Sequence, residues 1–336
     1  MSKNQCKQEC VLKKTSIGGQ ALIEGVMMRG PQKTAMAVRH TSGEIRMEEF
    51  DNPVSKCGWI KKVPLVRGLF GMIDSLRFGY KCLMRSAELS GLEEELEGAL
   101  DEEQAKKKAD TSEDAPAEKK DNKKKAGVLM GVVMVIGTVL GFGLSLVLFM
   151  WLPIQLFKWL TLAVPSLENP YLRGVFEGLV RILIFLGYML AVSRMKDIRR
   201  TFQYHGAEHK SIFCYEKGLP LTVENVRAQK RFHPRCGTSF LVLMLVVGII
   251  ISILIPISHP VWRTVIKLAL LPLTVGVGYE LIKLAGRHDN WFTRAISAPG
   301  VWMQHITTIE PDDAMIECAI KALEAVIPED PEADQW

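Results

Sequence analysis

The stretch TSFLVLMLVVGIIISILIPI, residues Thr238–Ile257, contains no charged side chain. A helix of this length rises about 30 Å, at about 1.5 Å per residue, which matches the hydrocarbon core of a bilayer. The stretch is therefore typical of a membrane-spanning helix, and it predicts an integral membrane protein.

Three further runs are mainly apolar and long enough to cross a bilayer: Ala126–Leu152, Gly174–Val192 and Trp262–Lys283. We therefore expect a mainly α membrane protein with about four transmembrane helices, for which the lipid bilayer is the solvent.

A few ionisable residues fall inside these runs. Glu177 and Arg181 lie four residues apart on the second run, and each can pair with the other or with Lys267 on the fourth. Such charges are expensive in a membrane unless they are paired. We interpret them as structural pairs, because a transport path needs more buried charges than these four runs contain.

The distribution of basic residues predicts the orientation. The segment Arg194–Arg235 contains ten Lys and Arg residues, whereas the loop Pro153–Arg173 contains two and the turn Ser258–Val261 contains none. Positive charge favours the cytosolic side of a membrane. We therefore expect the N-terminal region, the central loop and the C-terminus to face the cytosol.

The N-terminal region is rich in strand signals. Gly18–Pro31 is typical of a strand with bends or a tight turn, and Thr34–His40 and Glu44–Phe50 are expected to form a hairpin. Residues 1–62 are thus predicted to be a small cytosolic β-rich domain. Met1–Lys14 is polar and basic and does not resemble a signal peptide.

Two segments link this region to the membrane. Residues 63–92 contain a basic amphipathic helix, Pro64–Glu88, which either lies in the headgroup layer or packs into the soluble core. Residues 93–125 are charge-dense and predicted to be a disordered tether. Transmembrane helices follow at 126–193 and 238–283, on either side of a basic cytosolic loop at 194–237.

The C-terminal region, 284–336, is expected to remain cytosolic. Asn290–Gln304 mixes aromatic residues around a Pro299–Gly300 break and is typical of an interfacial segment. A short amphipathic helix is expected to begin near Pro311.

The basic loop contains Tyr204-His205-Gly206-Ala207-Glu208-His209-Lys210, in a chain with seven histidines. On a helix, His205, Glu208 and His209 share one face. Two imidazoles one turn apart can hold a divalent metal, zinc first, and a carboxylate beside them can act as a base. The alternative is a polar helix cap without a metal.

Further metal ligands could come from two other clusters. His233 and Cys236 follow the motif, and His288 and Asp289 come after the last apolar run. In this hypothesis Glu208 accepts a proton from a water that zinc activates, and Lys210 or Arg287 holds an anionic substrate or oxyanion. Hydrolysis of a peptide or a lipid-linked ester at the membrane surface is the expected chemistry.

The sequence disfavours both a nucleic-acid-binding protein and a disulfide-bonded protein. The positive-inside rule already explains the basic loop, and we find no nucleic-acid recognition motif, so no nucleic-acid partner is expected. Seven cysteines form no regular framework, which indicates reduced thiols.

Four ordered motifs resemble a known family. They are Gly18–Ala21 with Glu24–Pro31, Tyr204–Lys210, His233–Ser239 and Glu310–Asp313. Together they are similar to domain-of-unknown-function family 1385, the YqhQ type. The resemblance implies a multi-pass protein of the bacterial cytoplasmic membrane and a metal-dependent enzyme.

We therefore expect a metal-dependent membrane hydrolase. The alternative is a non-catalytic membrane factor that assists a membrane-protein partner in insertion, assembly or quality control, in which the amphipathic helix and the tether bind and the histidines stabilise the loop.

Overall fold

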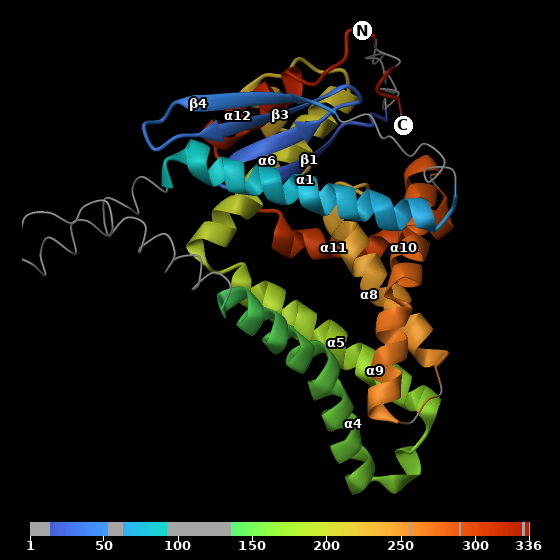
Figure 1. The fold of residues 1–336 in the computed structure, drawn as a ribbon. Helices are drawn as coiled ribbons and strands as arrows, with labels where there is room; N and C mark the ends of the chain where they lie inside the picture. Colours follow the sequence, from blue (N-terminus) through green and yellow to red (C-terminus); the bar gives the residue numbers. More distant parts are fainter. Residues whose placement is uncertain are drawn as a thin grey trace, which may run out of the picture. The chain divides into compact units, whose positions relative to one another are not determined.

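The computed structural model describes residues 14–52, 63–92, 136–255, 257, 259–288, 290–330 and 333–335 (Figure 1). The predicted tether lies outside the described residues, as does the start of the first predicted span. Most of the described chain is helical, and a small antiparallel sheet precedes the helices, which confirms the coarse fold class.

The elements form two compact units. The first contains the sheet, α1, α6, α7, α10, α11, α12 and the start of α8; the second contains α4, α5, α9 and the end of α8. The strands are β1 (Gly18–Leu22), β2 (Gly25–Arg29), β3 (Lys33–Arg39) and β4 (Ile45–Asp51). The helices are α1 (Val66–Ser90), η2 (Val147–Trp151), α4 (Leu152–Ala163), η3 (Pro165–Leu167), α5 (Pro170–Val192), α6 (Lys196–Glu216), α7 (Val223–Arg227), α8 (Gly237–Ile253), α9 (Pro260–Ala269), α10 (Leu271–Arg287), α11 (Trp291–Thr307) and α12 (Asp313–Glu324).

The sheet is an antiparallel meander in the order β1-β2-β3-β4. The register between β3 and β4 pairs Arg39 with Ile45, which confirms the predicted hairpin. Leu22 pairs with Gly25, so a two-residue turn joins β1 to β2, and Glu24 in that turn has a φ of 51°. Positive φ values are favoured in tight hairpin turns.

Both faces of the central strands β2 and β3 are buried, which explains why these two strands are apolar. On β2, Val26 and Met28 pack into a core with α6 and α12, whereas Met27 faces the opposite side. Side chains alternate along a strand, so a strand covered on both faces must be apolar at successive positions. The sheet is therefore an inner layer of the first unit (Figure 1).

Helix α1 packs against the sheet, which is one of the two locations predicted for it; the location in the headgroup layer stays a prediction. Cys82 is buried against the sheet beside Met27, so one face belongs to the core. Phe70, Leu76 and Tyr80 are nonetheless 45%, 63% and 61% exposed. The helix thus covers the sheet and still presents apolar side chains outward.

The centre of α6 is buried on all sides. Tyr204 and Ala207 face the core that contains α12. Asp312 caps α12 by accepting a hydrogen bond from the Met315 amide at 2.8 Å. The segment before α12 also contacts α6, because the Ile309 amide donates to the Phe202 carbonyl at 2.9 Å.

Gly206 allows that close contact. A Cβ atom there would lie 3.3 Å from Ile309 C and 3.4 Å from Pro311 Cδ, and closer still to the Ile309 carbonyl oxygen. Backbone atoms cannot move aside as a flexible side chain can, so a methyl group would push the C-terminal segment away from α6.

We expect Gly206→Ala to destabilise the first unit by about 1–3 kcal/mol, the usual effect of overpacking. Gly71→Ala is the matched control, since a Cβ there meets only Tyr279 Cε2 at 4.0 Å within the same unit. Denaturant unfolding of the purified protein in detergent measures both variants. Equal midpoints would contradict the contact.

Two described helices are long and apolar enough to cross a membrane, Ile136–Ala163 and Pro170–Val192. A third crossing is formed if Val261–Ala269 and Leu271–Arg287 count as one bent span. The 17 residues of α8 rise only about 25 Å, short of the roughly 30 Å core.

The predicted fourth run is interrupted. The chain leaves α9 at Leu270 and begins α10 at Leu271, so Pro272 lies in the first turn of a new helix. Proline is tolerated there because it lacks an amide hydrogen, and it would break a continuous helix.

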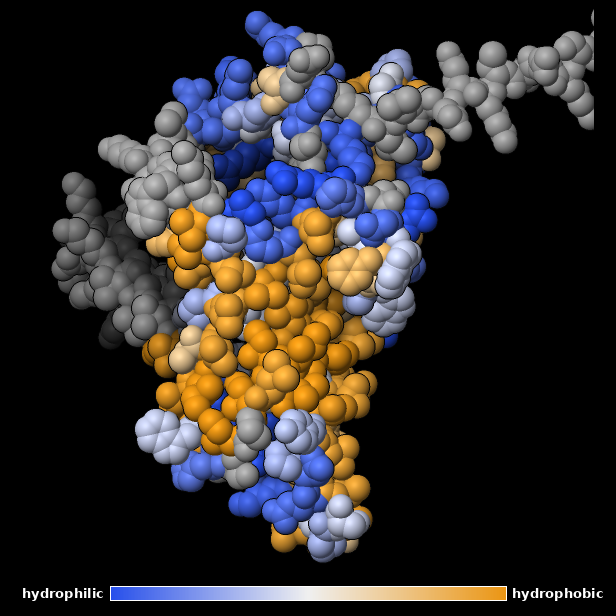
Figure 2. Space-filling view, turned by 90° about the vertical axis from the view of Figure 1, so that its right-hand side faces the viewer, coloured by the Kyte–Doolittle hydropathy of each residue, from blue (hydrophilic) through white to orange (hydrophobic). Residues whose placement is uncertain are grey.

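Exposed hydrophobic side chains accompany the apolar helices. Leu162, Leu183 and Leu254 are 75%, 67% and 71% exposed. Figure 2 shows an extended hydrophobic surface containing few hydrophilic residues. Water-soluble monomers rarely expose large apolar areas, so this surface is compatible with a membrane protein.

The predicted interfacial segment is helix α11. Trp291 and Trp302 are 79% and 57% exposed, and the helix continues through Pro299 without the expected break. Asn290 forms a capping box with Thr293 at its start.

Candidate metal centre

Helix α6 brings three predicted site residues onto one face. His205, Glu208 and His209 are all buried, with exposed fractions of 8%, 4% and 1%. The two imidazole rings lie 4.4 Å apart between centroids. The helical spacing therefore places the two imidazoles side by side, as the sequence predicted.

Backbone carbonyls orient both rings. His205 Nδ1 donates to Thr307 O at 2.8 Å, and His209 Nδ1 donates to Arg231 O at 2.5 Å. A carbonyl only accepts, so each Nδ1 carries a hydrogen and each Nε2 of the neutral ring has its lone pair available. Metal-binding histidines are commonly oriented in this way.

Cys236 completes the cluster from the turn that precedes α8. Its Sγ lies 3.1 Å from His205 Nε2 and 3.2 Å from Thr238 Oγ1. Sγ and one nitrogen from each of His205 and His209 lie within 4.8 Å of one another. His209 Nε2 makes no hydrogen bond within the described chain, although it is buried.

The charges in this cluster favour a thiolate. Burial opposes ionisation of Cys236, but the adjacent His205 and His209 outweigh it and hold the thiol pKa well below its ordinary value. Burial also lowers the pKa of His205, yet Cys236 raises it overall to about 9. Thiolate is the form of cysteine that binds metals.

Gln304 on α11 fixes the turn that contains Cys236. Its side chain accepts a hydrogen bond from the His233 amide at 2.7 Å and donates to the His233 carbonyl at 2.7 Å. It also donates to Ser239 Oγ at 3.1 Å. A fully buried amide thereby holds the backbone on both sides of Cys236.

Glu208 lies beside the cluster and against β1. The Gly19 backbone hydrogen-bonds to it, and a Cβ on Gly19 would lie 2.7 Å from Glu208 Cγ. Burial raises the pKa of Glu208, although the neighbouring imidazoles oppose the shift. Its Oε2 is buried without a hydrogen-bond partner among the described residues. A buried carboxylate with one free oxygen beside two imidazoles suits a general base.

His233 belongs to a neighbouring cluster. Its ring centroid lies 5.7 Å from that of His209, but its Nε2 faces Glu216 Oε2 at 3.5 Å and its Nδ1 accepts from the Arg235 amide at 3.3 Å. Both ring nitrogens of His233 therefore have partners outside the metal cluster, so His233 does not join the three candidate ligand atoms.

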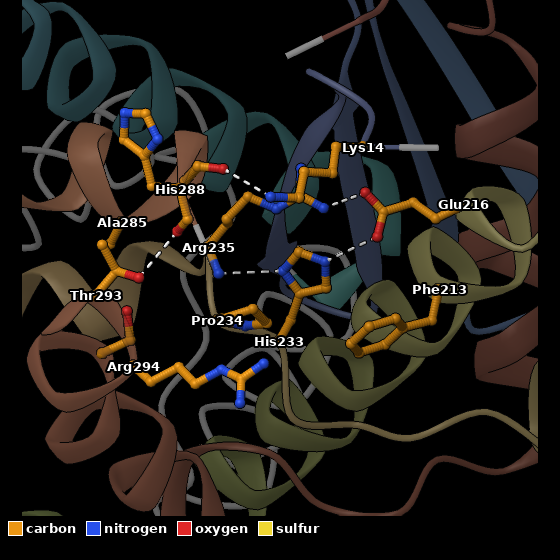
Figure 3. A pocket seen from close by; sticks show the side chains of 12 residues that line it. Lys14, Phe213, Glu216, His233, Pro234, Arg235, Ala285, His288, Thr293 and Arg294 are labelled. Atoms are coloured by element: carbon orange, nitrogen blue, oxygen red, sulfur yellow. Dashed lines mark hydrogen bonds and ion pairs between the residues drawn. The ribbon is translucent and has the colours of Figure 1, made fainter. Parts of the chain in front are cut away.

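A cavity of about 320 Å³ adjoins this second cluster (Figure 3). Figure 3 shows Arg235 bridging toward Glu216, with His288 on the opposite wall. Its polar lining consists of three cations, two hydroxyl groups, two imidazoles and one carboxylate, namely Lys14, Arg235, Arg294, Thr293, Ser297, His233, His288 and Glu216.

The remaining predicted residues lie elsewhere. Lys210 is buried, where its ammonium donates to the Arg227 carbonyl at 2.8 Å and pairs with Glu310. His288 is exposed and lines the cavity, and Arg287 is exposed at the end of α10. Asp289 lies outside the described residues. Three of the six candidate ligands thus converge.

Sequence reasoning missed the supporting residues. Gln304 is a single amide among apolar neighbours, and Glu216 is one of many acidic residues. Gly19 is in a family motif, but nothing in the sequence connects it with Glu208. The carbonyls of Arg231 and Thr307 leave no sequence signal at all.

These features define a protein with membrane-type helices and a cluster of two buried histidines and a half-buried cysteine beside a buried glutamate. The chain belongs to the family described as "Protein of unknown function (DUF1385)", whose model matches residues 63–329. It is 36% identical over 315 residues to "Uncharacterized protein YqhQ" of Bacillus subtilis (strain 168), covering 92% of each chain. No solved structure matches.

Proposed function

We propose that the protein is a metal-dependent hydrolase at the cytosolic face of a bacterial membrane. The observation that supports this proposal is the convergence of His205, His209 and Cys236 within 4.8 Å, with Glu208 buried beside them. Hydrolytic zinc sites use three protein ligands and leave one position open.

The ligand atoms fit zinc in kind and in spacing. Zinc bonds to nitrogen and sulfur are about 2.0–2.3 Å long, so atoms that share one ion lie roughly 3–4 Å apart. The 3.1 Å separation of His205 Nε2 and Cys236 Sγ lies within this range, and all three ligand atoms lie within 4.8 Å of one another. The buried Nε2 of His209 lacks a partner, which a metal would supply.

Each residue has a defined role in the proposed reaction. His205, His209 and Cys236 would hold the ion, and zinc bound there would supply a water with a pKa of about 7. Glu208 Oε2 would accept the proton of that water, and Gly19 keeps the carboxylate in place. The cationic lining of the cavity beyond His233 suits a substrate with a negative group.

The proposed topology has four crossings and both termini in the cytosol, with α8 as a short third crossing at which the bilayer thins. Its support is the ten Lys and Arg residues between Arg194 and Arg235, against two in Pro153–Arg173. The candidate ligands lie in or directly after this basic segment, so the metal centre would face the cytosol.

The direct test is turnover by protein reconstituted in nanodiscs, first stripped with a chelator and then restored with zinc. A chromogenic carboxylic ester, a fluorogenic peptide and a lipid-linked ester serve as probes. We expect zinc to restore hydrolysis of one class by about 100-fold or more. Bound zinc without turnover of any probe would reject the enzyme.

A second candidate is a non-catalytic membrane factor. The exposed apolar residues of α1, Phe70, Leu76 and Tyr80, favour this function, because they offer a surface for a partner or a membrane. In this case Glu208→Gln would preserve cellular function, and replacing the three α1 residues by serine would abolish it.

A further inference from the structure

The second unit contains a group of buried charges that the proposed metal centre does not use. Glu177 on α5 is fully buried, and four cationic side chains surround it. They are Arg173 and Arg181 on α5 and Arg263 and Lys267 on α9. The group has one negative charge against four positive charges.

Glu177 neutralises only part of the positive charge of the four cations. Its Oε1 accepts from Arg173 Nε at 2.9 Å, and its Oε2 accepts from Lys267 Nζ at 3.0 Å. Arg181 Nη2 lies 3.4 Å from Oε2. The Arg181 Nε instead donates to the carbonyl of Phe149, in the π-helical turn η2, at 2.8 Å.

Arg263 is the least satisfied of the four. Its side chain is 1% exposed, and its closest approach to Glu177 is 3.5 Å, from Nη2 to Oε2. Nε, Nη1 and Nη2 make no hydrogen bond within the described chain. A guanidinium has five N–H donors and is always charged, so leaving them unpaired in a buried position is costly.

An anion would remove this imbalance. A tetrahedral oxyanion offers several acceptor oxygens, and guanidinium groups bind phosphate through paired hydrogen bonds. The apolar helices around the group exclude water and strengthen each such contact. The side chains of Arg173, Arg181 and Lys267 are 12–16% exposed, so part of the cationic group is accessible from outside the unit.

We propose that Arg263, with Arg173, Arg181 and Lys267, forms a binding site for a phosphate group in the apolar unit. The phosphate is either the headgroup of an anionic phospholipid or free inorganic phosphate. Glu177 holds the four cations together, and the ligand neutralises the charge that Glu177 leaves. This site is independent of the metal centre.

Binding is measured on the full chain purified in detergent and freed of lipid. One arm adds radiolabelled inorganic phosphate, and the other adds phosphatidylglycerol or phosphatidylcholine and detects retained lipid by native mass spectrometry. Retention of phosphatidylglycerol alone assigns a headgroup, and binding of inorganic phosphate assigns the free ion.

Arg263→Gln is expected to weaken binding about tenfold or more, because it removes a charged donor pair. Lys158→Gln removes an exposed charge from the same unit and should bind as the wild type does. Equal binding by the wild type and Arg263→Gln would overturn the site.

A wild-type measurement covers the case in which Arg263→Gln does not fold. Phosphatidylglycerol or phosphate should raise the melting temperature of the wild-type protein, whereas phosphatidylcholine or chloride at equal concentration should not. Absence of both binding and stabilisation would reject the proposal.

Discussion

Replacing both His205 and His209 by alanine is expected to lower bound zinc from about one equivalent per chain to less than about a tenth. The change removes two of the three converging ligand atoms, and a single thiolate does not hold zinc tightly. Elemental mass spectrometry of detergent-purified protein measures the metal directly, without knowledge of the substrate.

Two single variants sharpen this measurement. Cys236→Ser should lose most of the zinc, whereas His233→Ala should keep it, because both nitrogens of His233 already face Glu216 and the Arg235 amide. His259→Ala, at an exposed position, controls for histidine content. A wild-type protein that folds but never contains zinc, even after zinc is added, would refute the metal centre.

Glu208→Gln is expected to reduce hydrolysis about 100-fold or more while zinc remains bound. Glutamine keeps the size of the side chain but cannot accept the proton, and general bases commonly contribute 10²–10⁴ in rate. The measurement is the zinc-dependent turnover in nanodiscs together with the metal content of the same sample.

Gly19→Ala tests the position of the carboxylate. The new Cβ would lie 2.7 Å from Glu208 Cγ and 2.9 Å from Oε1. Because Glu208 is buried, its side chain has little room to move away. We therefore expect lower turnover with zinc retained. Gly18→Ala is the matched control, because a Cβ at Gly18 meets no atom within 4 Å. Full turnover in Glu208→Gln would contradict the role of Glu208 as the general base.

Local patterns predicted the elements that depend on neighbours in the chain. Helical spacing placed His205 and His209 on one face of α6, and two strand-like runs close together in the chain predicted the hairpin of β3 and β4. Hydropathy predicted the apolar helices, although α8 is shorter than the predicted third run and Pro272 begins a new helix within the fourth. These elements can be predicted from the sequence because each depends on residues that are close together in the chain.

The identity of the third ligand needed the tertiary structure. His233 and Cys236 lie three residues apart, and both were suitable by chemistry. Gln304 holds the turn so that Cys236 faces His205 while His233 faces Glu216. The hydrogen bonds that make this choice join residues about 70 positions apart, which no local pattern records.

The sequence by itself therefore determined the family, the apolar helices and the pair of histidines, because these follow from motif, hydropathy and helical period. Only the tertiary structure brought Gly19 against Glu208, covered both faces of the central strands, and added Arg173 and Arg263 to Arg181 and Lys267, the predicted partners of Glu177. Contacts between segments far apart in the chain depend on packing geometry, and this geometry leaves no local periodicity in the sequence from which it could be predicted.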